Sequence, residues 1–377
     1  MHQSHLKASC FLTILFALVV SGCAPAKSVP TPTSTPTISP TATATPPAVI
    51  IGIDTMLDNL AQQSLFTGAV LIAKQGKVLL SKGYGLADRA QNIPNTPQTR
   101  FRLGSLTKQF TAMAILILEK QGKLNVNDLI CKYIPDCPST WAAITIKHLL
   151  THTSGIPNFT SFADYEGTKG LPSTPIQTIA RFKDKPLDFQ PGGKFSYSNS
   201  GYVVLGYIIE QVSGQTYEEF LQQSIFTPLN LRDTGYDHNS NSLAVGYPDK
   251  NSTLPADFID MSIPYSAGAL YSTVGDLYQW EQSLSTEQLV PKAYLDEMFT
   301  SQVTVPGSGL GYGYGWYIGK DPLGRSINEH IGGIEGFASI IARYPDDQVT
   351  IIILSNQQDL NVALTLQTLS TQIFSNP

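Results

Sequence analysis

Hydrophobic runs at both ends of the chain predict β-strands. Residues 68–88 contain two β-rich runs separated by "KQGK", a spacing typical of a β-hairpin. Residues 337–356 contain two more, and Pro345, Asp346 and Asp347 mark the turn between them. We therefore expect one antiparallel sheet that takes strands from both ends of the chain.

Between these runs the pattern becomes helical. Residues 105–121 are apolar nearly all round, which is typical of a helix buried inside a domain. Further helical patterns follow at residues 145–152, 201–214, 216–229 and 360–374. The predicted fold class is α+β: an antiparallel sheet built from both chain ends and flanked by helices, with a mainly helical inserted subdomain at roughly residues 107–265.

Residues 1–22 are typical of an export signal, with a short polar start and an apolar core from about Ala8 to Val20. This core is shorter than the roughly 20 residues that a spanning helix needs, so a permanent transmembrane anchor is less favoured. The small residues before Cys23 resemble the bacterial lipobox, in which the cysteine becomes the lipidated N-terminus. An ordinary secretory signal that ends near Cys23 is the alternative.

Residues 23–48 are predicted to be a disordered tether, because residues 30–47 are almost wholly Pro, Thr, Ser and Ala and cannot bury enough apolar surface to fold. Residues 49–377 then form the folded domain. These features predict an exported protein that a lipid on Cys23 holds on the extracytoplasmic face of a membrane. If Cys23 is not lipidated, the protein is secreted.

The composition is that of a globular protein. Of the 377 residues, 42% are hydrophobic and 14% are charged, so the chain can bury a sizeable core. The net charge of -5, without any long basic block, argues against a nucleic-acid partner. Cys131 and Cys137 lie close together and could pair in an exported protein, although two buried free thiols are an equally open interpretation.

The candidate chemistry begins with Ser105 and Lys108. Residues three apart share one face of a helix, so the amine can reach the hydroxyl if the helix begins at about Ser105. A serine hydroxyl needs a base to become a good nucleophile, and a lysine serves only if burial and positive potential keep it neutral. The alternative is that Ser105 simply caps the helix and Lys108 is solvated, since Ser4 and Lys7 form a second such pair.

Two further stretches carry candidate groups. Tyr197 and Asn199 are two apart in a predicted extended loop, so they point the same way and offer a proton carrier and an amide. His330 precedes Gly332 and Gly333 at what we expect to be the mouth of a strand, where bare backbone lets a substrate lie close. Taken singly, each has an ordinary packing or turn interpretation.

Four separated stretches agree, in order, with one known family. They are "FRLGSLTKQFTA", "LLTHTSGIP", "FSYSNSGYVVLG" and "HIGGIEGF". Over nearly all of residues 52–370 the chain resembles the serine β-lactamase and penicillin-binding protein superfamily, especially its class C β-lactamase, D,D-carboxypeptidase and esterase branch.

The resemblance implies an extracytoplasmic serine hydrolase that forms an acyl-enzyme on an ester, amide or D-amino-acid peptide, with no cofactor and no metal. It implies that the backbone N–H groups of Ser105 and Gly333 form an oxyanion hole. The implied catalytic residues are Ser105 as nucleophile, Lys108 as proton acceptor and Tyr197 as proton shuttle, and the implied substrate-binding residues are Asn199, His330, Gly332 and Gly333.

The third motif departs from the family pattern. β-Lactamases and D,D-peptidases usually carry Lys-Thr-Gly where this chain has His330, Ile331 and Gly332. An unperturbed histidine is mostly neutral at pH 7 and Ile331 has no hydroxyl, so the grip on a substrate carboxylate is weakened. We expect β-lactam turnover to be slow or absent. A true β-lactamase or D,D-carboxypeptidase, and a penicillin-binding sensor or binding lipoprotein that does not hydrolyse, remain the alternatives.

Other chemistries fit less well. His148 and His152 are four apart, as in a zinc protease, but Leu149 stands where that motif has its glutamate. No serine has the flanking glycines of an α/β-hydrolase elbow. The aromatic residues Tyr312, Tyr314 and Trp316 are interpreted as core packing. The expected partners are a small-molecule or peptide substrate and, through the lipid, a membrane; the sequence does not predict an oligomeric state.

Overall fold

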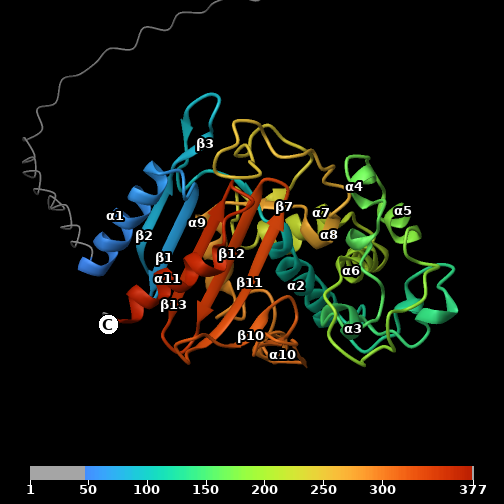
Figure 1. Ribbon diagram of the computed structural model, residues 1–377. Helices are drawn as coiled ribbons and strands as arrows, with labels where there is room; N and C mark the ends of the chain where they lie inside the picture. The colour runs from blue at the N-terminus through green and yellow to red at the C-terminus, as the bar shows by residue number, and fades with distance from the viewer. Residues whose placement is uncertain (1–46, 376–377) are drawn as a thin grey trace, which may run out of the picture. The chain divides into compact units, whose positions relative to one another are not determined.

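An eight-stranded antiparallel sheet forms the centre of the computed structural model, which describes residues 47–375 (Figure 1). The predicted export signal at residues 1–22, Cys23 and all but the last two residues of the predicted tether lie outside the described residues. The strands, in spatial order, are β2 (Lys77–Tyr84), β1 (Gly68–Lys74), β13 (Val349–Ser355), β12 (Phe337–Tyr344), β11 (Ser326–Ile334), β10 (Tyr317–Lys320), β9 (Gly311–Tyr312) and β8 (Val303–Thr304).

The pairing of β1 with β13 joins the two ends of the chain. Gly68 lies opposite Ser355 and Lys74 lies opposite Val349. The first strand of the N-terminal hairpin, β1, is therefore paired along its whole length with β13 of the C-terminal hairpin. Every residue of β12 and β13 is buried, because helices cover both faces of this part of the sheet. This arrangement confirms the predicted sheet and its composition from both chain ends.

The helices divide into those that cover the sheet and those that build a helical part beside it (Figure 1). Helices α1 and α11 lie on one face of the sheet, while α2 and α9 lie on the other. The bounds are α1 (Ala48–Gln62), α2 (Thr107–Lys120), α3 (Ile146–Leu150), α4 (Tyr165–Thr168), α5 (Pro175–Ala180), α6 (Asn199–Ser213), α7 (Tyr217–Leu221), α8 (Tyr265–Gly268), α9 (Val274–Ser283), α10 (Lys292–Met298) and α11 (Val362–Ser375).

Short strands complete the fold. Strands β5 (Phe101–Arg102), β7 (Leu270–Ser272) and β6 (Gly235–Tyr236) form a small sheet, and β3 (Leu86–Asp88) pairs with β4 (Ile93–Pro94). Because β5 and β7 bracket α2 to α8, the helical part is an insertion between paired strands, and the α+β class is confirmed.

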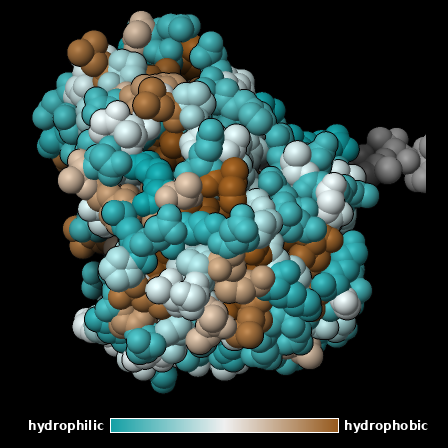
Figure 2. Space-filling view, turned by 90° about the vertical axis from the view of Figure 1, so that its right-hand side faces the viewer, coloured by the Kyte–Doolittle hydropathy of each residue, from teal (hydrophilic) through white to brown (hydrophobic). Residues whose placement is uncertain are grey.

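The face of the helical part in Figure 2 is largely polar, with apolar residues in separate patches.

Helix α2 is the centre of the larger hydrophobic core. Every residue from Thr107 to Leu118 is buried, as the uninterrupted apolar pattern predicts, and Phe110 stacks on Trp280 of α9 with ring centroids 4.3 Å apart. A second core lies between the sheet and α1 with α11. The position of α2 between the sheet and the helical part is what brings Lys108 into the interior.

Some element boundaries differ from the predictions. Helix α1 was not predicted; it begins at Ala48, one residue before the predicted domain, and buries Ile50, Ile53 and Leu57. The helix predicted from Ser105 begins at Thr107, after a 3-10 turn η1 (Gly104–Leu106).

The two cysteines of the helical part are paired in a disulfide, Cys131–Cys137.

Within residues 47–375, the structure contains no helix with both the length and the apolar character that crossing a membrane requires.

A buried ion pair ties α9 to the sheet. Arg343 of β12 donates to Glu281 of α9 across 2.8 Å, and Thr350 of β13 donates to the other carboxylate oxygen across 2.8 Å. The two charged side chains are only 8% and 6% exposed. Removing one member of such a pair leaves the other buried without compensation, which is strongly destabilising.

We predict that Glu281→Gln lowers the free energy of unfolding by about 3 kcal/mol in urea denaturation of the purified protein. The matched control is Asp296→Asn, because Asp296 pairs with Lys292 on the surface, where the two side chains are 61% and 71% exposed. That change should cost less than about 0.5 kcal/mol. Equal effects of the two substitutions would contradict a structural role for the buried pair.

Candidate active site

Ser105 lies in the turn η1 that leads into α2, and it lines a cavity of about 340 Å³. The residue before it, Gly104, has φ +54°, and a Cβ there would lie 2.7 Å from the carbonyl oxygen of Gly333 in β11. Glycine is therefore required for the turn to approach the strand so closely. This approach places Ser105 and Gly333 in the wall of the same cavity.

Lys108 lies one helical turn further on and is fully buried. Its Nζ is 3.0 Å from Ser105 Oγ, 2.8 Å from Asn199 Oδ1 and 2.8 Å from the carbonyl oxygen of Ala267. The last two oxygens can only accept hydrogen bonds. A neutral amine has two hydrogens for them, which leaves its lone pair directed at the Ser105 hydroxyl.

The charge state of Lys108 is governed by its burial. Burial lowers the pKa of Lys108 well below its ordinary value of 10.5, which favours the neutral amine over the ammonium. Nζ also lies 4.8 Å from the ring centroid of Tyr197 and 5.5 Å from that of Tyr202, and both phenols are uncharged because burial raises their pKa values. Lys108 therefore has both the position and the protonation preference of a general base.

Tyr197 approaches Ser105 from the loop before α6, with its hydroxyl 2.7 Å from Ser105 Oγ. Burial raises the pKa of Tyr197 well above its ordinary value, and the hydrogen bond with Ser105 opposes that rise only in part. The neutral phenol donates to Ser105 Oγ, so the proton of Ser105 remains directed toward Lys108. The hydroxyl of Ser105 thus has a proton acceptor and a proton donor at the same time.

Asn199 is the first residue of α6 and its amide is held in one orientation. Oδ1 accepts from Lys108, while Nδ2 donates to Thr160 Oγ1 across 3.1 Å. Its backbone N–H donates to Asn158 Oδ1 across 3.0 Å. Asn199 and Thr160 both line the cavity. Four of the residues singled out from the sequence, Ser105, Lys108, Tyr197 and Asn199, therefore meet at one place.

Behind Tyr197 runs a chain of four hydrogen bonds. The Ser198 N–H donates to His152 Nδ1 (3.1 Å), so His152 carries its proton on Nε2 and donates to the Tyr312 hydroxyl (3.2 Å). Tyr312 in turn donates to His330 Nε2 (3.0 Å), and His330 Nδ1–H donates to the Ile331 carbonyl (2.7 Å). The partners fix the tautomer of each ring, and both histidines are neutral.

The pKa values agree with this pattern. Burial, together with the nearby Lys108, lowers the pKa of His330 to about 3 and that of His152 well below its ordinary value. The His152 ring lies against Tyr197 with centroids 4.3 Å apart, so the chain supports the phenol from behind.

His330 lies outside the cavity that Ser105 lines. It is 1% exposed, it is not among the residues that line the cavity, and it lies within β11 rather than at its mouth. That His330 binds a substrate stays a prediction, and the geometry places its ring behind the cavity rather than in its wall. Its hydrogen bond to Tyr312 instead connects β11 to the ring that backs Tyr197.

The two glycines of β11 differ from each other. A Cβ at Gly332 would lie 2.0 Å from the Leu103 carbonyl oxygen and 2.3 Å from Ser339 Oγ, so this glycine allows the strand to pack on the turn that carries Ser105. It does not line the cavity. Gly333 does, and a Cβ there would meet nothing within 4 Å. Only Gly333 thus has the open position expected of a substrate-binding glycine.

His148 and His152 have separate structural environments. His148 completes a capping box with Thr145 at the start of α3, whereas His152 follows the helix with φ +57°. The two rings therefore do not share one helical face. Among residues 47–375 no group of three or more His, Cys, Asp or Glu side chains is arranged to hold a metal ion.

Some contributors to the site have no sequence signal. Three such groups form hydrogen bonds with residues that are distant in the sequence: the Ala267 carbonyl, the Thr160 hydroxyl and the Tyr312 hydroxyl. Tyr312, Tyr314 and Trp316 are fully buried, which confirms the interpretation as core. Glu335 was not predicted to lie at the site. It is the one acidic residue of the motif "HIGGIEGF" and follows the paired glycines, so the motif contained a signal for it.

Glu335 gives the cavity its charge. Among the described residues that line this space, it is the one with a charged side chain. Its Oε1 lies 3.1 Å from Lys169 Nζ, but that ammonium also meets Glu166 at 2.6 Å and Asp257 at 4.0 Å. One ammonium thus faces three carboxylates, and the surroundings of the cavity are acidic on balance.

Comparisons with known proteins agree on one family. A sequence model described as Beta-lactamase matches residues 53–370. Penicillin-binding protein 4* of Bacillus subtilis (strain 168) is 30% identical over 330 residues, which cover 81% of this chain and 72% of that protein.

Solved structures resemble the chain over a similar span. The octameric penicillin-binding protein homologue from Pyrococcus abyssi has a TM-score of 0.73 and 32% identity, covering 82% of this chain and 73% of that one. A D-stereospecific amidohydrolase from Streptomyces sp. has a TM-score of 0.68 and 27% identity, covering 80% of this chain and 94% of that one.

We predict that Tyr312→Phe destabilises the protein by about 2 kcal/mol, because it leaves His152 Nε2–H and His330 Nε2 buried without partners. In ¹⁵N NMR of the imidazoles, the wild type should show the proton on Nε2 of His152 and on Nδ1 of His330. Tyr207→Phe is the control, since its hydroxyl makes no hydrogen bond to a described residue and its loss should cost less than about 0.5 kcal/mol. The opposite tautomer at either histidine would refute the chain of hydrogen bonds.

Proposed function

The chain belongs to the beta-lactamase family, and on that premise we propose that it is an extracytoplasmic serine hydrolase that forms an acyl-enzyme on Ser105. The observation that carries the proposal is the hydroxyl of Ser105 held between the buried amine of Lys108 and the phenol of Tyr197. A hydroxyl with an acceptor on one side and a donor on the other is prepared to lose a proton and attack a carbonyl.

The acylation step uses these three groups. Lys108 takes the proton of Ser105 as Oγ bonds to the carbonyl carbon of the substrate. The bond to the leaving group then breaks, and the leaving oxygen or nitrogen takes the phenolic proton of Tyr197. The Lys108 ammonium returns its proton to Tyr197, so both residues regain their starting states. Water later hydrolyses the ester on Ser105 with the same groups handling its proton.

The oxyanion of the tetrahedral intermediate needs hydrogen-bond donors. We assign this role to the backbone N–H groups of Ser105 and Gly333, because Gly104 lets the two backbones approach and Gly333 faces the cavity. Asn199 has a positioning role through its hydrogen bond to Lys108 and can present its amide to the substrate from the cavity wall.

The location outside the cytoplasm is supported by two independent features. The N-terminal sequence is typical of an export signal with a lipid-accepting Cys23. The Cys131–Cys137 disulfide is a bond that persists in oxidising compartments and is rare in the cytosol. We propose that a lipid on Cys23 tethers the domain to the outer side of a membrane.

The charge of the cavity bears on the substrate. A site that grips a penicillin or a D-Ala-D-Ala terminus needs a cation for the substrate carboxylate, yet Lys108 is enclosed and Lys169 faces carboxylates. Glu335 lines the cavity instead. The proposed substrates are therefore esters or amides, including D-amino-acid amides, whose acyl part carries no carboxylate. The similarity to a D-stereospecific amidohydrolase supports amide cleavage.

The primary experiment measures the intact mass of the purified protein after brief exposure to p-nitrophenyl acetate and to benzylpenicillin. Wild type should gain an acetyl mass that decays within minutes, whereas Ser105→Ala should gain none. Stable retention of a penicilloyl mass would favour a sensor that traps β-lactams over a hydrolase. Equal labelling of the two proteins, or no labelling of wild type, would contradict the role of Ser105 as the nucleophile and therefore the proposed function.

A second experiment compares the p-nitroanilides of D-phenylalanine and N-succinyl-D-phenylalanine, which differ in charge but share a leaving group. We expect a higher kcat/KM for the free ammonium substrate, and Glu335→Gln should reduce that preference about fivefold. Glu166→Gln is the matched control, because Glu166 also pairs with Lys169 but does not line the cavity. A preference for the succinylated substrate would contradict the charge argument without affecting the role of Ser105.

A further inference from the structure

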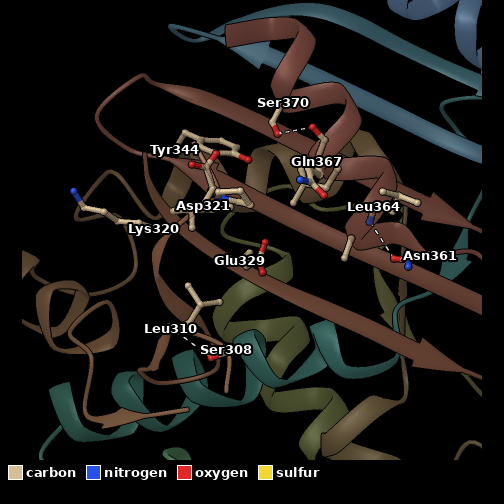
Figure 3. Close-up of a pocket in the computed structure, with 14 residues that line it drawn as sticks. Ser308, Leu310, Lys320, Asp321, Glu329, Tyr344, Asn361, Leu364, Gln367 and Ser370 are labelled. Carbon is tan, nitrogen blue, oxygen red and sulfur yellow. Dashed lines mark hydrogen bonds between the residues drawn. The ribbon is translucent and has the colours of Figure 1, made fainter. Parts of the chain in front are cut away.

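A second cavity, of about 550 Å³, lies on the face of the sheet that α11 covers (Figure 3), whereas α2, which follows Ser105, packs on the opposite face. Its walls come from the strands β10 and β11, from the end of β12, from the loops beside these strands and from α11. It shares no lining residue with the cavity at Ser105. We call this space the outer pocket. Its volume is in the range of small-molecule sites.

The outer pocket has apolar walls around one central carboxylate. Leu310, Ile327 and Leu364 contribute apolar surface, and Leu364 is 58% exposed at the rim. Glu329 of β11 lies between them and points into the space, as Figure 3 shows. A ligand in this pocket would contact hydrocarbon on several sides and two acidic groups, Glu329 and Asp321.

The carboxylate of Glu329 has no partner among the described residues. The structure shows neither a hydrogen bond nor an ion pair for it with residues 47–375, although burial and the nearby Asp321 raise its pKa to about 6. Lys320, the lysine that lines the pocket, extends away from it in Figure 3. Arg325 is engaged elsewhere, with Asp347 at 2.6 Å and over the ring of Phe374.

Asp321 adds to the negative character of the outer pocket. Its Oδ1 accepts from the backbone N–H groups of Leu323 and Arg325, while its Oδ2 is buried without a hydrogen-bond partner among the described residues. A partly buried carboxylate without a cation is costly, and an incoming cation would remove that cost. A metal ion fits poorly, because among residues 47–375 no group of three or more His, Cys, Asp or Glu side chains is arranged to hold one.

We propose that the outer pocket binds a small organic cation, with an ammonium group on Glu329 and an apolar arm along Leu310, Ile327 and Leu364. The ammonium donates to the free carboxylate oxygens, and the arm covers the hydrocarbon at the rim. This site is separate from the proposed hydrolytic site and does not depend on its activity. Glu329 immediately precedes His330, so an occupant would contact the strand that also carries Gly333.

The test is an NMR titration of the ¹⁵N-labelled protein at pH 7.5 with three probes of similar shape: 2-phenylethylamine, 2-phenylethanol and 3-phenylpropionate. The amine should cause saturable shifts at residues of β10, β11 and α11, whereas the alcohol and the carboxylate should bind at least tenfold more weakly. Equal binding of amine and alcohol, or no saturable binding of the amine, would overturn the proposal.

Two variants locate the site. Glu329→Gln should weaken amine binding about tenfold with the fold retained, as judged by the unchanged spectrum of residues outside the pocket. Glu335→Gln is the matched control, because it removes the acidic group of the other cavity and should leave these shifts unaltered. Leu364→Lys, which places an ammonium at the exposed rim, should also reduce binding. Loss of amine binding in Glu335→Gln with retention in Glu329→Gln would assign the ligand to the Ser105 cavity instead.

Discussion

The enclosure of one lysine amine is the constraint on which the site depends. Lys108 is fully buried, so its amine must find acceptors within the protein and must favour the neutral form. Those acceptors come from α6, through Asn199, and from the carbonyl of Ala267 in α8. The helical part and α2 therefore have to be packed together before Ser105 acquires a base. In this protein the proposed catalytic geometry and the main hydrophobic core are formed by the same contacts.

The back of the site is organised by neutral groups rather than by charges. His152 and His330 share the hydroxyl of Tyr312, and each ring has one possible tautomer given its partners. With these rings uncharged, burial is the cause that lowers the pKa of Lys108. The charges that do approach the cavity are acidic on balance, around Lys169 and Glu335. The site thus combines a neutral interior with an acidic rim.

Much of the fold could be predicted from the chain. The two hairpins, the buried helix at residues 105–121 and the antiparallel sheet from both ends all follow from hydrophobic periodicity, since each covers enough residues to show its period. Helix α1 escaped prediction although Ile50, Ile53 and Leu57 carry a helical spacing, because it directly follows a proline-rich stretch. The start of α2 was placed two residues early, because a 3-10 turn and an α-helical turn have similar side-chain patterns.

The sequence by itself determined which residues could do the chemistry. Ser105 and Lys108 are three positions apart in the chain, and the ordered motifs identified Tyr197 and Asn199 as further candidates. Only the tertiary structure decided what His330 and Gly332 do. It places His330 behind Tyr312 and packs Gly332 against Leu103, whereas Gly333 lines the cavity. It also brought Glu335 to the cavity, and on the opposite face of the sheet it left the Glu329 carboxylate without a hydrogen bond or ion pair among residues 47–375. The physical reason is that hydrogen bonds and burial depend on atoms contributed by distant segments, which no local pattern of residues records.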